Sequence, residues 1–339
     1  MDNRYSRQML FAPIGIEGQQ KIAAKHVLIV GAGALGTGNA EVLVRAGIGK
    51  LTIVDRDYVE WSNLQRQQLY VEEDAKRGIP KAIAAKERLK QINSEVEIAA
   101  HVADVTPLEF EQLIAGVDLI LDATDNFDIR MIINDIAHKH RIPWIYGSCV
   151  GSYAISYTII PGETPCLHCL METVPLGGLT CDTAGIISPA ANMVVVQQTT
   201  EALKIVTENW SVLQNKLVSY DLWKNEQVAM DISVMKNTEC TTCGSQPTYP
   251  FLSYENQTKT AVLCGRNTVQ IRPSNMEERN LEKIAETLYG LGRKVKRNPF
   301  LLSFIIDEKR LVLFKDGRAL VHGTNDVAKA KTLYHQFFG

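Results

Sequence analysis

Residues 27–67 read VLIVGAGALGTGNAEVLVRAGIGKLTIVDRDYVEWSNLQRQ, and this stretch decides the fold of the chain. An apolar run, Val27 to Val30, breaks into the glycine-rich turn GAGALG, and a segment with helix-forming sequence follows. A second apolar run, Leu51 to Val54, ends on Asp55. This order predicts a strand, a glycine turn, a helix and a second strand, with an acid about 20 residues after the glycines. The stretch is therefore typical of the nucleotide-binding βαβ unit of an α/β protein.

The three glycines of the turn, Gly31, Gly33 and Gly36, suit contact with a phosphate group. Glycine lets the backbone approach a phosphate closely, and the N-terminus of the following helix offers unpaired N–H groups and a positive dipole. Asp55 can accept a hydrogen bond from a ribose hydroxyl. An NAD-dependent dehydrogenase would use the same loop and the same acid, so these residues alone do not separate an oxidoreductase from another nucleotide-binding protein.

The polar residues that follow the second strand favour a transferase over a dehydrogenase. Asp57, Asn63, Arg66 and Gln67 come just after the strand end, where open α/β sheets bind their ligands. Hydride transfer has no use for an arginine at this place. A phosphoryl or nucleotidyl transferase does, because the negative charge on the phosphate oxygens must be neutralised in the transition state.

The cysteines indicate a metal site. Their number, seven, is odd, and the N-terminal sequence MDNRYSRQML has no pattern of an export signal, so metal binding or catalysis is favoured over a disulfide framework. Two Cys-x-x-Cys pairs, Cys166 with Cys169 and Cys240 with Cys243, can each give two thiolates to one tetrahedral Zn²⁺. Their separation exceeds that of a usual zinc ribbon, so a redox dithiol remains the alternative on spacing alone.

Several short motifs occur between residue 1 and about residue 245. They are Arg4-Tyr-Ser-Arg7-Gln8, Gly31 to Gly36, Asp55-x-Asp57, Ser62-Asn-Leu-Gln-Arg-Gln67, Pro80-Lys81, Thr124-Asp125-Asn126 and the two Cys-x-x-Cys pairs. No single motif is specific, but in this order the set resembles the ThiF/MoeB/HesA family, the bacterial relatives of the ubiquitin-activating enzymes. The resemblance implies an α/β fold, with a Rossmann-like mixed-sheet adenylation domain and a structural zinc.

The resemblance implies an ATP-dependent adenylyltransferase that activates the C-terminal Gly-Gly carboxylate of a small ubiquitin-like sulfur carrier of the ThiS or MoaD type. This step would release pyrophosphate, and a persulfide sulfur donor would then supply sulfur for thiamin or molybdopterin biosynthesis. The sequence does not decide between the two carriers. An NAD-dependent oxidoreductase and a non-catalytic scaffold are the alternative classes, although a degenerate scaffold would be expected to lose Arg66 or Asp125.

The resemblance also assigns roles to charged residues. Lys81, in the first turn of a helix expected from Pro80 to about Asn93, would lie near a bound anion; the alternative is a solvated lysine. Asp125 would hold Mg²⁺ against the phosphates of ATP; the alternative is that it only caps the helix expected from Asn126 to His140. Arg7 would reach into the active site of the neighbouring subunit of a homodimer; the alternative is a solvated helix arginine.

The resemblance bears on the cysteines as well. It implies that Cys166, Cys169, Cys240 and Cys243 form a structural zinc site, because four thiolates leave no open position for water or substrate. Cys181 matches the family cysteine that is linked through sulfur to the carrier in ThiF-like members and is not needed for adenylation in MoeB-like members. Whether Cys181 forms such a link stays open.

Length and charge indicate two modules. The chain has 339 residues and a net charge of −2, but residues 1–258 hold 21 Lys+Arg against 30 Asp+Glu, whereas residues 259–339 hold 15 against 8. We expect an adenylation domain over residues 1–245, a linker over residues 246–258, and a small basic C-terminal α+β domain of unknown role over residues 259–339.

Composition also narrows the partners. No apolar stretch approaches the roughly 18 residues that a membrane span needs, so no membrane is expected, and the chain is predicted to be cytoplasmic. The basic run from Arg293 to Arg297 would suit an acidic protein such as the carrier. Nucleic acid is poorly supported because the run is short and only Phe300 lies close by as a stacking aromatic.

Overall fold

The computed structural model describes residues 3–171, 184–253, 260–263, 267–273 and 278–338. The chain divides into two compact units. The first comprises residues 1–179 and 185–256, and the second comprises residues 180–184 and 257–339. Each unit is built on a sheet of its own.

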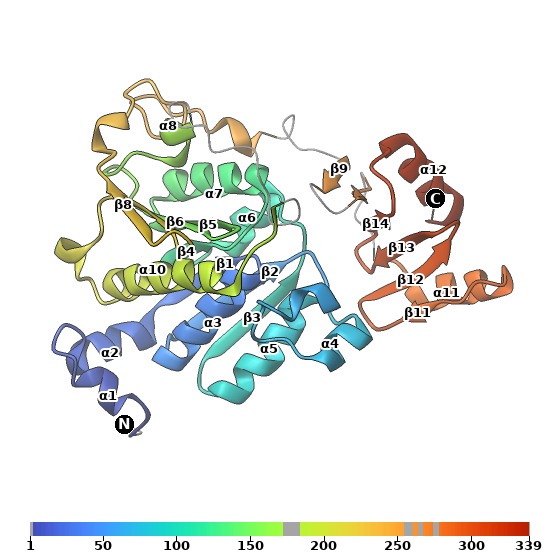
Figure 1. The fold of residues 1–339 in the computed structure, drawn as a ribbon, viewed down its shortest axis with the longest axis horizontal. Helices are drawn as coiled ribbons and strands as arrows, with labels where there is room; N and C mark the ends of the chain where they lie inside the picture. Colours follow the sequence, from blue (N-terminus) through green and yellow to red (C-terminus); the bar gives the residue numbers. More distant parts are fainter. Residues whose placement is uncertain (1–2, 172–183, 254–259, 264–266, 274–277, 339) are drawn as a thin grey trace. The chain divides into compact units, whose positions relative to one another are not determined.

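The first unit contains an eight-stranded sheet with the strand order β3-β2-β1-β4-β5-β6-β7-β8 (Figure 1). Neighbouring strands from β3 to β5 are parallel, and those from β5 to β8 are antiparallel. The predicted Rossmann-like mixed sheet is therefore confirmed. The strands are β1 (His26–Val30), β2 (Lys50–Asp55), β3 (Glu97–Val102), β4 (Leu119–Asp122), β5 (Trp144–Val150), β6 (Tyr153–Ile159), β7 (Leu217–Asp221) and β8 (Glu226–Met230).

Apolar residues on both faces of the central strands bury this sheet between two layers of helices. On β1, Val27 and Ile29 belong to one hydrophobic core and Leu28 and Val30 to another, because successive side chains of a strand point to opposite faces. Helices α3, α5 and α10 cover the first face, and α6 and α7 cover the second (Figure 1). The helices are α1 (Ser6–Met9), α2 (Gly15–Ala24), α3 (Ala34–Ala46), α4 (Glu72–Arg77), α5 (Lys81–Ile92), α6 (Pro107–Leu113), α7 (Phe127–His140), α8 (Leu167–Met171) and α10 (Ser188–Val206).

The strand order reverses at β1, which pairs with β2 on one side and with β4 on the other. All three strands are parallel, so their carboxyl ends lie at the same edge of the sheet. Open α/β sheets bind ligands at such a reversal point. Val30, Asp55 and Asp122 are the last residues of these strands, and the loops that follow them are therefore brought together.

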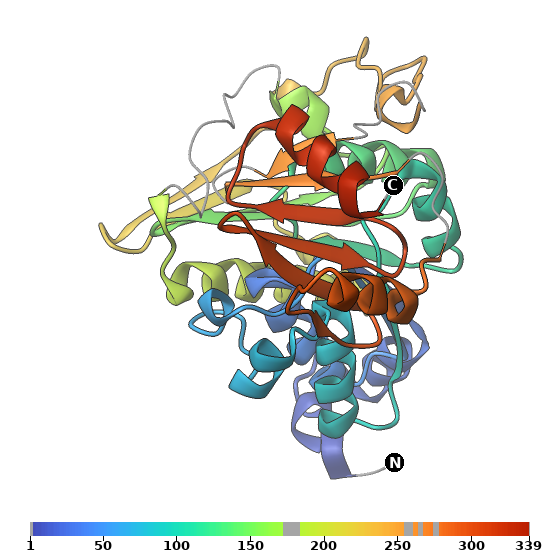
Figure 2. The ribbon, with the colours of Figure 1, turned by 90° about the vertical axis from the view of Figure 1, so that its right-hand side faces the viewer.

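The second unit contains a six-stranded antiparallel sheet with the order β11-β12-β13-β14-β10-β9. Both of its described helices lie over one face of this sheet, where Leu288 and Leu333 join the core (Figure 2). The expected small α+β arrangement is thus confirmed. The elements are β9 (Thr260–Leu263), β10 (Thr268–Ile271), α11 (Leu281–Gly290), β11 (Lys296–Arg297), β12 (Leu301–Ile306), β13 (Lys309–Phe314), β14 (Ala319–His322) and α12 (Val327–Phe338).

Across the described ranges of both units, no helix combines the length and the apolar character that crossing a bilayer requires.

Candidate active site

The glycine turn lies against the loop that follows β4. Gly31 has a φ of +99°, which residues with a Cβ rarely adopt, and a Cβ there would lie 2.5 Å from the carbonyl oxygen of Ala123. A Cβ on Gly36 would overlap the carbonyl oxygen of Gly31, so glycine at this position lets α3 pack against the turn. Gly33 is different, because the nearest atom to its Cβ position is Nε2 of Gln67 at 3.9 Å. Gly33 is also the N-cap of α3 and provides no side-chain cap, which leaves the first N–H groups of the helix available to an anion.

These glycines allow a matched pair of substitutions. We expect Gly36→Ala to lower the free energy of unfolding by about 1–3 kcal/mol, because the added methyl group overlaps the Gly31 carbonyl. We expect Gly33→Ala to change the stability by less than about 0.5 kcal/mol and to weaken nucleotide binding, because the methyl group takes the space in which a phosphate would approach the backbone. Thermal denaturation and calorimetric titration with ATP measure the two effects. Equal stabilities of the two variants would contradict the packing role of Gly36.

Asp55 faces the glycine turn from the end of β2. Its Oδ2 accepts a hydrogen bond from the Ala32 backbone N–H at 2.6 Å, and its Oδ1 accepts one from the Asp57 N–H at 2.7 Å. Burial raises the pKa of Asp55 above its ordinary value, and the charge of Lys81 opposes that shift. Lys81 begins α5, is 4% exposed, and places its Nζ 3.3 Å from Oδ2 of Asp57. The alternative of a solvated surface lysine is therefore wrong.

The segment after β2 carries the predicted polar residues. Oδ1 of Asn63 accepts a hydrogen bond from the Glu60 N–H at 2.9 Å, and Nη1 of Arg66 donates to the Ser62 carbonyl at 2.9 Å. Gln67 is 3% exposed, and its Oε1 has no hydrogen-bond partner among the described residues. A buried amide oxygen without a partner is costly, so this atom, beside the glycine turn, indicates a place for a ligand.

Tyr70, which the motifs did not single out, joins three parts of the site. Its buried hydroxyl lies 2.7 Å from the carbonyl oxygen of Ala32 in the glycine turn and 3.1 Å from that of Lys81. It also ends the segment that carries Arg66 and Gln67. The apolar pair Leu69-Tyr70 was a signal of burial, but the partners of the hydroxyl lie 38 and 11 residues away and leave no local pattern.

Asp125 and Asn126 lie in the loop between β4 and α7. The Ala123 N–H donates to the Val30 carbonyl at 2.9 Å, which holds this loop beside the glycine turn. Asn126 is the N-cap of α7, and its Oδ1 accepts a hydrogen bond from the Asp128 N–H at 2.8 Å. Asp125 is exposed and is not the cap, so the alternative that it only caps the helix is wrong.

Arg130 on α7 is a second residue that the motifs missed. It is 8% exposed; its Nε donates to Oδ2 of Asp122 at 3.0 Å, and its Nη2 donates to the carbonyl oxygens of Thr124 and Gly147. Burial raises the pKa of Asp122 above its ordinary value, and the charge of Arg130 opposes the shift. The available signal was an arginine among apolar residues on the inward face of a helix.

Within one chain, the structure does not bring Arg7 to these residues. Arg7 lies in α1, and its neighbour Gln8 donates through Nε2 to the carbonyl oxygen of Ala46 at 3.0 Å. Ala46 is the last residue of α3, whereas the glycine turn precedes the first. Since the 13 residues of α3 span about 20 Å, Arg7 lies near the far end of this helix.

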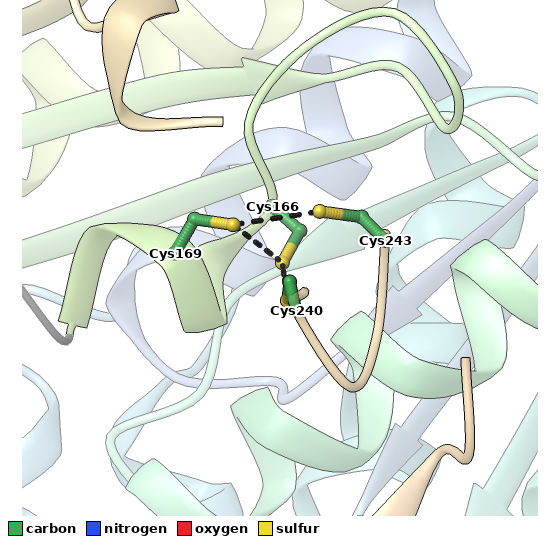
Figure 3. A group of neighbouring side chains, drawn as sticks. All are labelled: Cys166, Cys169, Cys240 and Cys243. Carbon is green, nitrogen blue, oxygen red and sulfur yellow. Dashed lines mark hydrogen bonds between the residues drawn. The ribbon is translucent and has the colours of Figure 1, made fainter. Parts of the chain in front are cut away.

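The four predicted cysteines meet in one cluster (Figure 3). The Sγ atom of Cys166 lies 3.6 Å from the Sγ of Cys240 and 3.8 Å from the Sγ of Cys169. The Sγ atoms of Cys169 and Cys243 are 3.4 Å apart. Zn–S bonds of about 2.3 Å in a tetrahedron place the sulfurs about 3.8 Å apart, so this donor set fits one Zn²⁺. The hydrogen bond between the two thiols lowers the pKa of Cys169 and raises that of Cys166, so the two groups share a proton in the absence of a metal. Cys181 lies outside the described residues.

Two adjacent residues of α7 hold the two cysteine loops. Oδ1 of Asn134 accepts a hydrogen bond from the Leu167 N–H at 2.9 Å, inside the first Cys-x-x-Cys pair. The Asp135 carboxylate accepts one from Oγ1 of Thr242 at 2.5 Å, inside the second pair. It also accepts one from the Phe251 N–H at 2.8 Å, in the stretch expected to be a linker. The middle of α7 therefore supports the cysteine cluster. Its start supports the edge of the sheet where the loops after β1, β2 and β4 meet, which we call the nucleotide edge.

This fold and site define a class: a Rossmann-type nucleotide-binding protein with a separate four-thiol cluster suited to a metal. The ThiF family model matches residues 5–242, so both the nucleotide edge and three of the four cysteines lie within the match. The chain belongs to the ThiF family.

Individual relatives agree with this assignment. The chain is 55% identical to the sulfur carrier protein ThiS adenylyltransferase of Bacillus subtilis strain 168 over 339 residues, which is 100% of both chains. It is 34% identical to the molybdopterin-synthase adenylyltransferase of Escherichia coli K12 over 244 residues, which is 71% of this chain and 96% of that one. A crystal structure of Escherichia coli MccB with ATP has 21% identity and a TM-score of 0.63, over 72% of this chain and 74% of that chain. The last likeness shows the fold.

Proposed function

We propose that this chain is an ATP-dependent adenylyltransferase that activates the C-terminal Gly-Gly carboxylate of a small ubiquitin-like sulfur carrier. The observation that carries the proposal is the meeting of a glycine turn, the buried Lys81 and the exposed Asp125 at the reversal point of the sheet. The full-length similarity to a ThiS adenylyltransferase supports a carrier of the ThiS type. The similarity to a molybdopterin-synthase adenylyltransferase supports testing a MoaD-type carrier beside it.

In the proposed reaction, a carboxylate oxygen of the carrier attacks the α-phosphorus of ATP. A bond forms between this oxygen and the α-phosphorus, and the bond from the α-phosphorus to the bridging oxygen of the β-phosphate breaks. Pyrophosphate leaves with that electron pair, and the carrier becomes an acyl-adenylate. The protein needs no nucleophile of its own, because its work is to hold the two groups in line and to neutralise phosphate charge.

The chain's own residues divide this work. Lys81 and Arg66 would neutralise the phosphate oxygens, and Nε2 of Gln67 would donate a hydrogen bond to them beside the glycine turn. Asp55 would accept a hydrogen bond from the ribose. We further propose that Arg7 of the partner subunit adds a third positive charge in a homodimer. Arg7 lies about 20 Å along α3 from the glycine turn, so Arg7 of the same chain does not reach the site. A partner's arginine is consistent with this placement.

We propose two metals with different roles. Mg²⁺ would be held by Asp125, whose exposed carboxylate offers the oxygen ligand that this ion prefers and is not used to cap α7. When bound there, Mg²⁺ neutralises charge on the phosphates of ATP. Zn²⁺ would be held by the four-cysteine cluster as a structural ion, since four thiolates complete its coordination.

The later steps and the domain roles follow from the same proposal. A persulfide sulfur donor would convert the acyl-adenylate to a thiocarboxylate for thiamin or molybdopterin biosynthesis, in the cytoplasm.

We propose residues 1–245 as the adenylation domain, residues 246–258 as the connection and residues 259–339 as an appended basic domain. The end of the ThiF family match at residue 242 supports this division.

Incubation of the full-length enzyme with ATP, Mg²⁺ and each purified carrier tests the function. We expect carrier-dependent exchange of pyrophosphate into ATP, and a carrier heavier by one adenylyl group in mass spectra when pyrophosphate is removed. Calorimetric titration with ATP and with NAD is the companion measurement, and binding of NAD in place of ATP would favour an oxidoreductase. If every carrier of both types emerged unchanged while ATP bound, the proposed function would be wrong.

A further inference from the structure

Arg130 lies where β4, β5 and α7 meet. Its Nε donates to Oδ2 of Asp122 at 3.0 Å, and its Nη2 donates to the carbonyl oxygens of Thr124 and Gly147 at 2.7 and 3.1 Å. Its guanidinium carbon lies 5.1 Å from the centre of the Tyr146 ring. One planar cation therefore bonds the end of β4, the middle of β5 and the loop between β4 and α7.

The loop that Arg130 holds is the loop that carries Asp125. Oδ1 of Asp122 accepts hydrogen bonds from the N–H and the Oγ1 of Thr124 at 2.9 and 2.7 Å, and the side chain of Asn126 caps α7. The residues on both sides of Asp125 are thus held by side-chain hydrogen bonds, whereas Asp125 itself is exposed. The backbone on both sides of Asp125 is therefore fixed by Asp122, Asn126 and Arg130.

We infer that Arg130 is a positioning residue, which holds the backbone of Thr124 and thereby aims the Asp125 carboxylate at the Mg²⁺ that accompanies ATP. The inference rests on the proposed function, in which Asp125 holds that ion. Arg130 is 8% exposed and acts through the loop rather than by touching ATP. It also neutralises Asp122, which is 0% exposed. Lysine cannot replace it, because an ammonium group lacks the planar fork that bonds three acceptors at fixed angles.

Titration calorimetry of the full-length protein with ATP, in Mg²⁺ and in EDTA, tests the inference without a carrier. In Arg130→Lys, we expect the gain in ATP affinity that Mg²⁺ provides to fall about tenfold, while the affinity in EDTA stays within about twofold of wild type. In the Asp125→Asn background, the same substitution should cause no further loss, because the ligand that it positions has been removed. Additive losses in this cycle would overturn the inference.

A milder variant serves if Arg130→Lys folds poorly. Thr124→Val has nearly the same shape and loses only the hydroxyl that donates to Asp122. It should shift the Mg²⁺ dependence of ATP binding in the same direction and by a smaller factor. An unshifted Mg²⁺ dependence in this variant would count against the inference.

Arg318 provides a matched control in the second unit. It is 1% exposed, donates through Nε to Asp316 at 2.7 Å and lies 4.4 Å from the centre of the Phe314 ring, so its surroundings resemble those of Arg130. Arg318→Lys should lower the melting temperature about as much as Arg130→Lys does, and it should leave the Mg²⁺ dependence of ATP binding unchanged. The inference would be overturned if the Mg²⁺ dependence of ATP binding changed equally in Arg130→Lys and Arg318→Lys, or if it changed in neither variant. If the wild type bound ATP with Mg²⁺ but adenylylated no carrier, the proposed function would fail, and these titrations would still decide the role of Arg130.

Discussion

Asp125→Ala is expected to lower carrier-dependent ATP–pyrophosphate exchange about 10²–10³-fold, the range seen when one group that stabilises transition-state charge is removed. The reason is electrostatic, since the attacking carboxylate and the ATP phosphates are all negative and the substitution removes the proposed ligand of their counter-ion. Stability should change little, because Asp125 is exposed and Asn126 is the cap of α7. Exchange of labelled pyrophosphate into ATP, at saturating ATP and carrier, is the measurement.

Asp128→Ala is the matched control for this loss. Asp128 is also an exposed acid, lies three residues further along in the first turn of α7, and interacts favourably with the positive end of the helix dipole. Its removal should cost at most about 1 kcal/mol of stability and leave exchange near the wild-type rate. Near-normal exchange in Asp125→Ala, or an equal loss in Asp128→Ala, would contradict the proposed role of Asp125.

Loss of metal from the four-cysteine cluster is expected to lower the melting temperature by about 10 °C or more, which corresponds to a few kcal/mol for a chain of this size. The cluster joins two loops, in which Cys169 and Cys243 lie 74 residues apart in the sequence and have their sulfurs 3.4 Å apart, and one ion would replace many weaker contacts. Exchange at saturating ATP, measured well below the melting temperature, should fall much less, because the cluster lies outside the nucleotide edge. Cys240→Ser and treatment with a chelator should both show this pattern.

Elemental analysis and a second cysteine variant control this experiment. We expect one zinc per chain in the wild type and a clear loss of zinc in Cys240→Ser. Cys149 lies outside the cluster and is partly buried, so Cys149→Ser should retain both zinc and melting temperature. Equal proportional losses of stability and exchange would oppose a structural role for the metal.

Much of the nucleotide edge could be predicted because its signals are local. The run from Val27 to Asp55 contains its own strand, turn, helix and strand, and each can be recognised from a few neighbouring residues. The parallel arrangement then follows from the crossover helix, and it places Asp55 and Asp125 at one edge. The two Cys-x-x-Cys pairs, about 70 residues apart, could be predicted to meet because of the resemblance to the family. Their spacing alone left a redox dithiol as the alternative.

The parts that could not be predicted depend on contacts between distant residues. Asn126 and Asp125 are both good helix caps, so the sequence could not decide which one caps α7. The hydroxyl of Tyr70 and the guanidinium of Arg130 have partners on other elements, and their roles appear only when the elements have packed. In the second unit, strand order was equally hidden, because the pairing of Thr268 with His322 joins residues that no local pattern connects.

Helix α7 is a single uninterrupted rod of 14 residues, about 21 Å long. Arg130 is near its start, and Asn134 and Asp135 lie one turn further along. An engineer who wants a new nucleotide preference should therefore vary the loops after β1 and β2 and leave this rod unchanged. A side chain altered on its inward face can disturb two separate sites, the loop that carries Asp125 near the start of the helix and the four-cysteine cluster at its middle.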